Sequence, residues 1–274
     1  MPELETLLYE EVDGVAVVTL NRPDVHNSFN NKMQDELHAL WQSLRTNDDV
    51  RAVLLTGAGD EAFCTGIDRV EAIEPFLADP TGQRRKGRVS TPFMFNSPGP
   101  RINPKQNDLW KPVVAAVNGM ACGGALYMLG ESDVILAAEH ATFFEPHVSY
   151  GMVAAFEGMH LLQKLPLGET LRLMLMGVHE RMSAQRAYEM GLVSEVVPLS
   201  ELRERALWVA TSIAKSPPLA VQGTLRAIWM AHENTRRQAL DMVSNYVGLG
   251  TTYDNIKAGQ QMFKDTERIE WRLR

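Results

Sequence analysis

The chain has 274 residues, of which 45% are hydrophobic and 22% are charged, and its formal net charge is −7 at pH 7. This length allows one large domain, or a domain with an appendage, to bury a substantial core. The negative charge argues against a nucleic-acid-binding surface, and no apolar stretch reaches the length of a membrane span. Cys64 and Cys122 are the only cysteines, which suits a reducing compartment. We therefore expect a cytoplasmic globular protein that contacts neither nucleic acid nor a membrane.

Strand and helix patterns alternate in the N-terminal half. Two β-rich runs, residues 6–12 and 15–20, are separated by Asp13-Gly14, which is a hairpin signal. A helix is predicted next, with Asn30 or Asn31 as its cap. Its apolar residues recur at helical spacing: Met33, Leu37, Leu40, Trp41 and Leu44.

Three further apolar runs, residues 52–56, 113–117 and 134–138, predict buried strands, and residues 124–130 predict a short helix. Strands separated by helices favour right-handed crossovers and a mostly parallel sheet. The sequence therefore predicts an α/β protein.

Residues 78–110 interrupt this alternation with five prolines and three glycines. A loop of this length inside a compact domain is usually functional or mobile. A lid over a binding site and a surface insertion are both consistent with it. The basic run at residues 84–88 is typical of a solvated loop, with anion binding as the alternative. Phe93, Met94 and Phe95 suggest an apolar or aromatic ligand pocket.

Helical patterns dominate from Leu161 onward, and such a cluster at one end of a chain commonly packs against a neighbouring subunit. We expect a core at residues 1–198 and a C-terminal helical region at residues 199–274. Beyond Leu161 the predicted helices are residues 169–176, 183–190, 201–215, 217–229 and 234–259, with a short strand at 193–197.

Two glycine-containing turns carry the chemical signal. Residues 63–68 follow the apolar run 52–56, and residues 118–125 follow the run 113–117. Each turn leads into a predicted helix start, where backbone N–H groups are unpaired and carry partial positive charge. Glycine allows close approach to that backbone. Two such turns facing each other would direct two donors at one developing negative oxygen, which is an oxyanion hole.

With these two turns and several other segments, the chain resembles the crotonase superfamily, whose best-known members are enoyl-CoA hydratases and isomerases. The matching segments occur in the expected order over about residues 10–200. They are residues 20–23 with Asn27, 53–57, 63–68, 111–119, 123–124, Asp133, Pro146, 183–185 with Ala187, and 191–193.

The resemblance implies a ββα spiral core, a C-terminal helical region that drives trimer formation, and therefore a homotrimer or a dimer of trimers. It implies an acyl-CoA thioester as the substrate and no other cofactor. By position, the oxyanion donors fall on the backbone N–H groups of Ile67 and Gly124. The coenzyme A contacts implied by the family fall on Val25, His26, Cys64, Thr65 and Asp68, with Ile67 also beside the pantetheine tunnel.

The chain differs from the hydratases of this family at two catalytic positions. The two glutamates of the family's hydratases fall on Tyr127 and His147. His147 is a candidate acid/base because imidazole titrates near neutral pH. Glu157 and Tyr127 are further candidates, and the alternatives are a solvated helix glutamate and a core tyrosine. Glu145 is another carboxylate beside the site, and an orientation away from it is left open.

Several functions are consistent with these residues. The first is an acyl-CoA enzyme of the enoyl-CoA hydratase/isomerase type. The alternatives are a different enolate reaction (isomerisation, decarboxylation or hydrolysis) or an acyl-CoA-binding protein without catalysis. A hydrolase with Cys122 as nucleophile is a weaker hypothesis. No metal site is expected from ligand spacing, and the glycine spacing does not fit a nicotinamide site.

Overall fold

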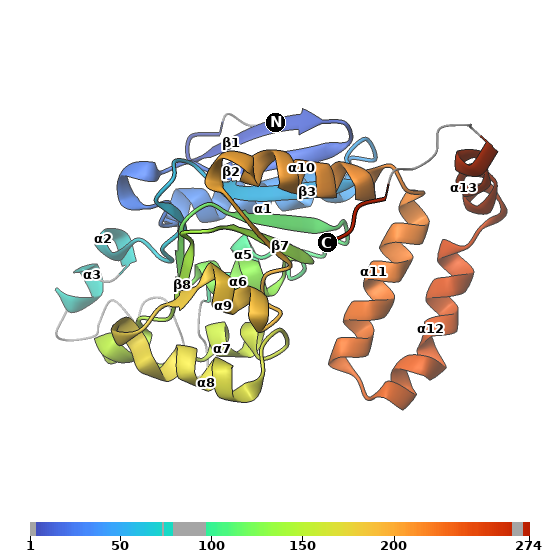
Figure 1. Cartoon of the computed structure of the whole chain (residues 1–274). Coiled ribbons are helices and arrows are strands. Elements are labelled where there is room, and N and C mark those ends of the chain that lie inside the picture. The colour runs from blue at the N-terminus through green and yellow to red at the C-terminus, as the bar shows by residue number, and fades with distance from the viewer. Residues whose placement is uncertain (1–3, 73, 79–96, 265–270) are drawn as a thin grey trace.

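The computed structural model describes residues 4–72, 74–78, 97–264 and 271–274. Its larger sheet has six strands in the order β1-β2-β3-β5-β7-β10, and it runs through the upper half of the molecule in Figure 1. β1 pairs with β2 antiparallel, and the other neighbours are parallel. The strands are β1 (Leu7–Val12), β2 (Val15–Leu20), β3 (Ala52–Gly57), β5 (Val113–Val117), β7 (Val134–Ala138) and β10 (Glu195–Val197).

A second sheet of four short strands is built from the turns that follow the first. Its order is β4-β6-β8-β9, with β4, β6 and β8 parallel and β9 antiparallel to β8. Each of β4, β6 and β8 comes directly after a strand of the larger sheet. This repetition confirms the predicted α/β class and ββα spiral. The strands are β4 (Ala62–Cys64), β6 (Met120–Cys122), β8 (Thr142–Phe144) and β9 (Met182–Ser183).

The helices cover the sheets and form the C-terminal region. Those up to residue 189 are α1 (Asn31–Thr46), α2 (Arg69–Ala72), α3 (Glu74–Leu77), α5 (Gly99–Ile102), α6 (Ala125–Gly130), α7 (Phe156–Leu161), α8 (Leu167–Met176) and α9 (Ala184–Glu189). The later ones are α10 (Leu199–Ala214), α11 (Pro218–Glu233), α12 (Arg236–Gly250) and α13 (Tyr253–Lys264), and the 3-10 turns are η1 (Pro23–Val25), η2 (His147–Tyr150) and η3 (Gly177–His179). None of the helices in the described ranges is long and apolar enough to cross a membrane.

The core forms where the central strands are apolar on both faces. All five residues of β5 are buried, as expected for a central parallel strand. The predicted apolar stripe of α1 is buried, and Asn30 is its cap because its side chain accepts from the Met33 amide. Trp41 is fully buried and donates from Nε1 to the Ile102 carbonyl at 2.8 Å. α10 contacts β2, β3, β5 and β7.

Several predicted elements differ in detail. The single helix expected over residues 234–259 is two helices, because α12 ends at Gly250 and α13 begins at Tyr253. The last strand begins at Glu195, two residues later than expected. Residues 97–110 are not an open loop: α5 lies within them and Leu109 is buried. Residues 84–88 and 93–95 lie outside the described residues.

α11 and α12 pack against each other and project away from the two sheets in Figure 1. Trp229 on α11 connects this pair to the core by donating from Nε1 to Asp133 Oδ1 at 2.7 Å. Figure 1 also places α10 on the larger sheet rather than with α11 and α12. The domain boundary at residue 198 stays a prediction.

Asn27 links the end of β2 to the second sheet. It is fully buried and has a φ of 54°, in the left-handed region. Its Oδ1 accepts from the Arg22 amide, and its Nδ2 donates to the carbonyls of Ala58 (2.9 Å) and Ala62 (2.8 Å). One side chain therefore satisfies three backbone groups and fixes the loop of residues 22–27 beside the first glycine turn.

Replacing Asn27 tests this link. Asn27→Gly keeps the backbone free to adopt positive φ but leaves the Arg22 amide and the Ala58 carbonyl without this partner, whereas the Ala62 carbonyl still accepts from Asn118 Nδ2 at 3.1 Å. Because the two lost bonds are half-buried, we expect the free energy of unfolding in urea to fall by about 2 kcal/mol in total. Asn27→Ala should lose about 1 kcal/mol more, because it adds left-handed strain. Wild-type urea midpoints for Asn27→Gly would contradict the assignment.

Candidate active site

The two glycine turns meet in space. Gly66 has a φ of 86° and Gly123 a φ of 55°. A Cβ atom added to Gly66 would lie 2.9 Å from the backbone nitrogen of Gly124 and 3.1 Å from the Cys122 carbonyl oxygen. Real Cβ atoms do not approach backbone that closely. The turns predicted to face each other are therefore in contact.

Among the residues that the structure describes, the amides of Ile67 and Gly124 have no hydrogen-bond partner at this contact. Phe29 donates to the Gly66 carbonyl (2.8 Å) and accepts from the Asp68 amide (3.0 Å). Because successive amides of an extended strand point to opposite sides, the Ile67 amide points away from Phe29. Among backbone hydrogen bonds between described residues, neither the Ile67 nor the Gly124 amide is a donor. Gly124 caps the N-terminal end of α6.

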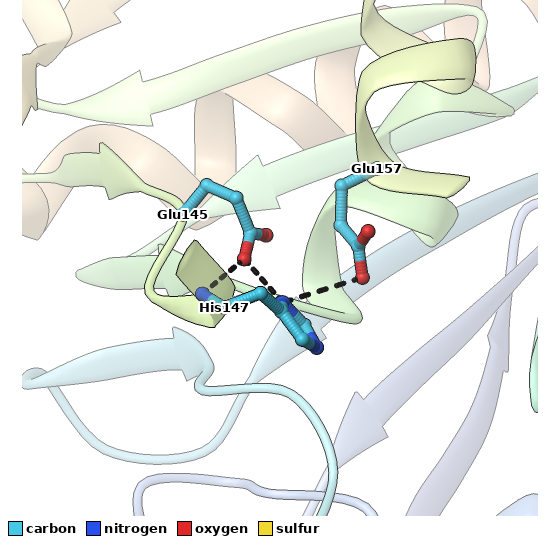
Figure 2. Close-up of side chains that lie close together, drawn as sticks. All are labelled: Glu145, His147 and Glu157. Atoms are coloured by element: carbon cyan, nitrogen blue, oxygen red, sulfur yellow. Dashed lines mark hydrogen bonds and ion pairs between the residues drawn. The ribbon is translucent and has the colours of Figure 1, made fainter. Parts of the chain in front are cut away.

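Two carboxylate side chains, those of Glu145 and Glu157, lie beside Nδ1 of the His147 imidazole (Figure 2). Glu145 directly follows β8, His147 opens η2, and Glu157 lies on α7. Nδ1 of His147 hydrogen-bonds to Oε1 of Glu145, and the His147 backbone amide donates to the same oxygen at 2.8 Å. Oε1 of Glu157 lies 3.7 Å from Nδ1.

Exposure distinguishes the three side chains of this cluster. The side chain of His147 is 20% exposed, whereas that of Glu145 is 0% and that of Glu157 is 2% exposed. The imidazole also lies beside the second turn, because a Cβ on Gly123 would be 3.7 Å from His147 Cε1. Of the three, only His147 offers surface to a molecule bound at the unpaired amides. The two carboxylates lie behind the imidazole.

The charges of the cluster act on one another. The hydrogen bond to Glu145 raises the pKa of His147, burial opposes this, and the negative charges of Glu145 and Glu157 add to the increase. Burial, followed by the charge of Glu145, raises the pKa of Glu157. Oε2 of Glu145 and Oε1 of Glu157 are buried without a hydrogen-bond partner. His147 and Glu157 therefore both hold their protons more tightly than isolated side chains would.

Tyr127 lies on α6 behind the same cluster. Burial is the main cause that raises the pKa of its hydroxyl, and a hydrogen bond with Glu157 contributes. Its ring contacts Phe156 edge-on, with centroids 6.3 Å apart, and lies 5.6 Å from the His160 ring. Of the candidate catalytic residues, the structure brings Tyr127, His147 and Glu157 together.

The residues that the family resemblance implies for coenzyme A border the first turn. Val25 and His26 are exposed, and Thr65 donates from its amide and its hydroxyl to the His26 carbonyl. Asp68 is buried and pairs with Arg22 at 2.8 Å. Cys64 is fully buried, so its side chain adds nothing to this surface.

Glu145 does not point away from the site, and the reason lies in the local backbone. Pro146 has helical-region dihedral angles (φ −86°, ψ −11°), so the chain is no longer extended after Phe144. This bend brings the His147 amide and ring onto the Glu145 carboxylate. This contact cannot be predicted from the sequence, because alternation along an extended strand does not hold across the bend.

Among the described residues, Glu145, His147 and Glu157 form a group that could hold a metal ion, with one ligand atom from each within 4.8 Å of the others. Imidazole and carboxylate are ligands that Zn²⁺ accepts. However, Nδ1 already shares a hydrogen bond with Glu145. A metal bound to that nitrogen would have to displace its proton.

Comparisons with known proteins identify the family of the chain. The family model described as enoyl-CoA hydratase/isomerase matches residues 10–274. The (E)-benzylidenesuccinyl-CoA hydratase of Thauera aromatica is 35% identical over 80% of this chain and 80% of its own. The 1,2-epoxyphenylacetyl-CoA isomerase of Escherichia coli K12 is 32% identical over 95% of both chains. The crystal structure of an enoyl-CoA hydratase/isomerase from Mycobacterium paratuberculosis has a TM-score of 0.82 and 36% identity, covering 99% of this chain and 100% of that one.

The two-sheet spiral, the paired glycine turns and these relatives place the chain in the crotonase superfamily. Within that superfamily, the chain belongs to the enoyl-CoA hydratase/isomerase family. The two positions at which the resemblance places the glutamates of hydratases carry Tyr127 and His147.

The environment of the two cysteines bears on the hydrolase alternative. Burial raises the pKa of Cys64 to about 12. Burial also raises the pKa of Cys122, and the neighbouring Cys64 and Glu145 add to the increase. A nucleophilic cysteine needs the opposite shift, because the thiolate is the reactive form.

We therefore expect slow alkylation of both thiols. Iodoacetamide at pH 8 should modify neither cysteine of the folded protein on the timescale on which free cysteine is consumed, and should modify both in urea. Intact-protein mass spectrometry counts the added groups. Rapid labelling of Cys122 in the folded protein, with loss of activity, would instead support a cysteine hydrolase.

Proposed function

We propose that this protein converts an acyl-CoA thioester through an oxyanion at the thioester carbonyl, stabilised by the backbone amides of Ile67 and Gly124. The observation that carries the proposal is the contact of the two glycine turns, each with an unpaired amide among the described residues, beside the one exposed side chain of a buried acid/base cluster. A preorganised donor of this kind contributes about 3–4 kcal/mol to the transition state in enzymes where one has been deleted.

We assign His147 as the acid/base group. Its Nε2 would take the proton from the carbon next to the thioester carbonyl. The electron pair of that C–H bond then forms the enolate, whose negative oxygen accepts hydrogen bonds from the two amides. Return of the proton from Nε2 to another carbon of the extended enolate completes an isomerisation and restores the neutral imidazole.

The remaining site residues support this arrangement. Val25, His26, Thr65 and Asp68 border the first turn, on the path that we propose for coenzyme A. Glu157 and Tyr127 lie behind the imidazole, so we propose that they act through His147 rather than on the substrate. The homotrimer, or dimer of trimers, remains our proposal for assembly, supported by exposed apolar side chains on α7 and α8 such as Met159, Leu171 and Leu175.

The choice among hydration, isomerisation, decarboxylation and hydrolysis depends on the substrate. The names of two relatives, a benzylidenesuccinyl-CoA hydratase and an epoxyphenylacetyl-CoA isomerase, favour including aromatic acyl groups in any test. Binding without catalysis is the other candidate, because the usual hydratase glutamates are replaced. The Glu145–His147 contact favours catalysis over this alternative, since it keeps a titratable group at the unpaired amides.

Gly66→Ala tests the two amides directly. Its Cβ would lie 2.9 Å from the Gly124 nitrogen and block the oxyanion position, so we expect kcat/KM to fall by about 100-fold or more. Gly191→Ala is the matched control, because Gly191 has the same φ of 86° and nothing within 4 Å of an added Cβ. Both variants carry the same backbone strain. Equal activities of the two would contradict the assignment.

His147→Gln tests the acid/base role. The purified protein is incubated with crotonyl-, cinnamoyl-, 3-ketoacyl- and malonyl-CoA, and the products are identified by mass spectrometry. With the substrate that turns over, we expect His147→Gln to lower kcat by at least about tenfold, within the range of general acid–base effects, while calorimetric binding of coenzyme A stays unchanged. Full activity of this variant would exclude His147, and binding of every thioester without turnover would favour a non-catalytic protein.

A further inference from the structure

We infer that Glu145 is a positioning residue, which forms a carboxylate–imidazole dyad with His147 and leaves Nε2 as the reactive nitrogen. This inference rests on the proposed function, because it concerns the group that moves the proton. Neither the replaced glutamate positions nor the family resemblance points to Glu145. The geometry of residues 145–147 and 157 does.

One carboxylate oxygen of Glu145 holds His147 in two places. Oε1 of Glu145 accepts both the His147 backbone amide at 2.8 Å and the ring nitrogen Nδ1. The first bond fixes where the side chain begins, and the second fixes the rotation of the ring. The carboxylate itself is fully buried, so water does not compete for these bonds.

The contact with Glu145 also determines which tautomer the His147 ring adopts. An ionised carboxylate is only an acceptor, so the proton of a neutral imidazole bonded to it is on Nδ1. Nε2 then carries the free electron pair, and among the described residues it has no hydrogen-bond partner. When Nε2 takes a proton, the resulting imidazolium is stabilised by the adjacent negative carboxylate. Glu145 therefore supports the imidazole in both states of the proposed cycle.

A second buried carboxylate, that of Glu157, lies near the same ring nitrogen of His147. Oε1 of Glu157 is 3.7 Å from the same Nδ1 and is buried without a hydrogen-bond partner. One imidazolium cannot neutralise two buried carboxylates, so the like charges favour a proton on one of them. Burial and the charge of Glu145 raise the pKa of Glu157, which favours its protonated form, and its carboxyl contacts the Tyr127 hydroxyl. The enolate then forms without a second negative charge behind the imidazole.

Glu145→Gln tests the charge of the dyad. The amide oxygen still accepts hydrogen bonds, but the charge that raises the pKa of His147 is lost. We expect the limb of the kcat–pH profile that reports His147 to move to lower pH, and kcat to fall by at least tenfold with KM changed less than twofold. Glu145→Asp should recover part of the lost kcat. An unchanged pH limb and an unchanged kcat would overturn the inference.

Glu36→Gln is the matched control. Glu36 is also a buried glutamate whose carboxylate accepts two backbone amides, those of Glu5 (2.9 Å) and Thr6 (3.0 Å). It lies on α1 and pairs with the start of β1 rather than with His147. Its replacement removes the same kind of group and should lower stability while leaving the pH profile unchanged. A matching shift of the pH limb in Glu36→Gln would show that the effect of Glu145→Gln is only structural.

A measurement without substrate separates this inference from the proposed function. In protein with ¹⁵N-labelled histidine, the His147 ring, assigned by its loss in His147→Gln, should above its pKa carry the proton on Nδ1. Glu145→Ala should lose this preference. If the preference is present but no thioester turns over, the dyad holds and the proposed function fails. If thioesters turn over and the ring shows no preference for Nδ1, the dyad is overturned.

Discussion

The site depends on the close approach of two backbone turns that have no room for side chains. A Cβ on Gly66 would lie 2.9 Å from the Gly124 nitrogen, and one on Gly124 would lie 2.4 Å from the Phe29 ring. The parallel pairing of β4 with β6 sets this distance, because each turn directly follows one of these strands. The second sheet therefore does more than extend the core. It holds the two turns in contact, and in the proposed function their amides then need no reorganisation during the reaction.

The second constraint is the placement of charge. The resemblance to hydratases locates carboxylates at positions 127 and 147, and this chain has neither. The carboxylates are instead Glu145 and Glu157, both buried behind the His147 ring. In the proposed reaction the group that meets the substrate is an imidazole, and the two carboxylates lie behind it, away from the enolate.

The sequence predicts well those features that depend on local periodicity. Residues 113–117 and 134–138 are strands with the predicted bounds, because strands buried on both faces are continuous apolar runs. The cap at Asn30 and the two glycine turns follow from equally local rules. The contact of Glu145 with His147 could not be predicted, because it depends on the bend at Pro146. The approach of Glu157 depends on how α7 packs, which a single sequence does not reveal.

The short helix α6 connects the second glycine turn to the acid/base cluster through Tyr127. α6 presents the Gly124 amide at its N-terminal end, and Tyr127 follows three residues later, on the same face of the helix. Its ring contacts Phe156 and His160 of α7, and His160 in turn hydrogen-bonds to Asn103 at 3.3 Å. Because Tyr127 contacts Glu157, a shift of α6 would move the oxyanion amide and the environment of the imidazole together. The amide and the acid/base cluster are therefore one packed unit rather than two independent sites.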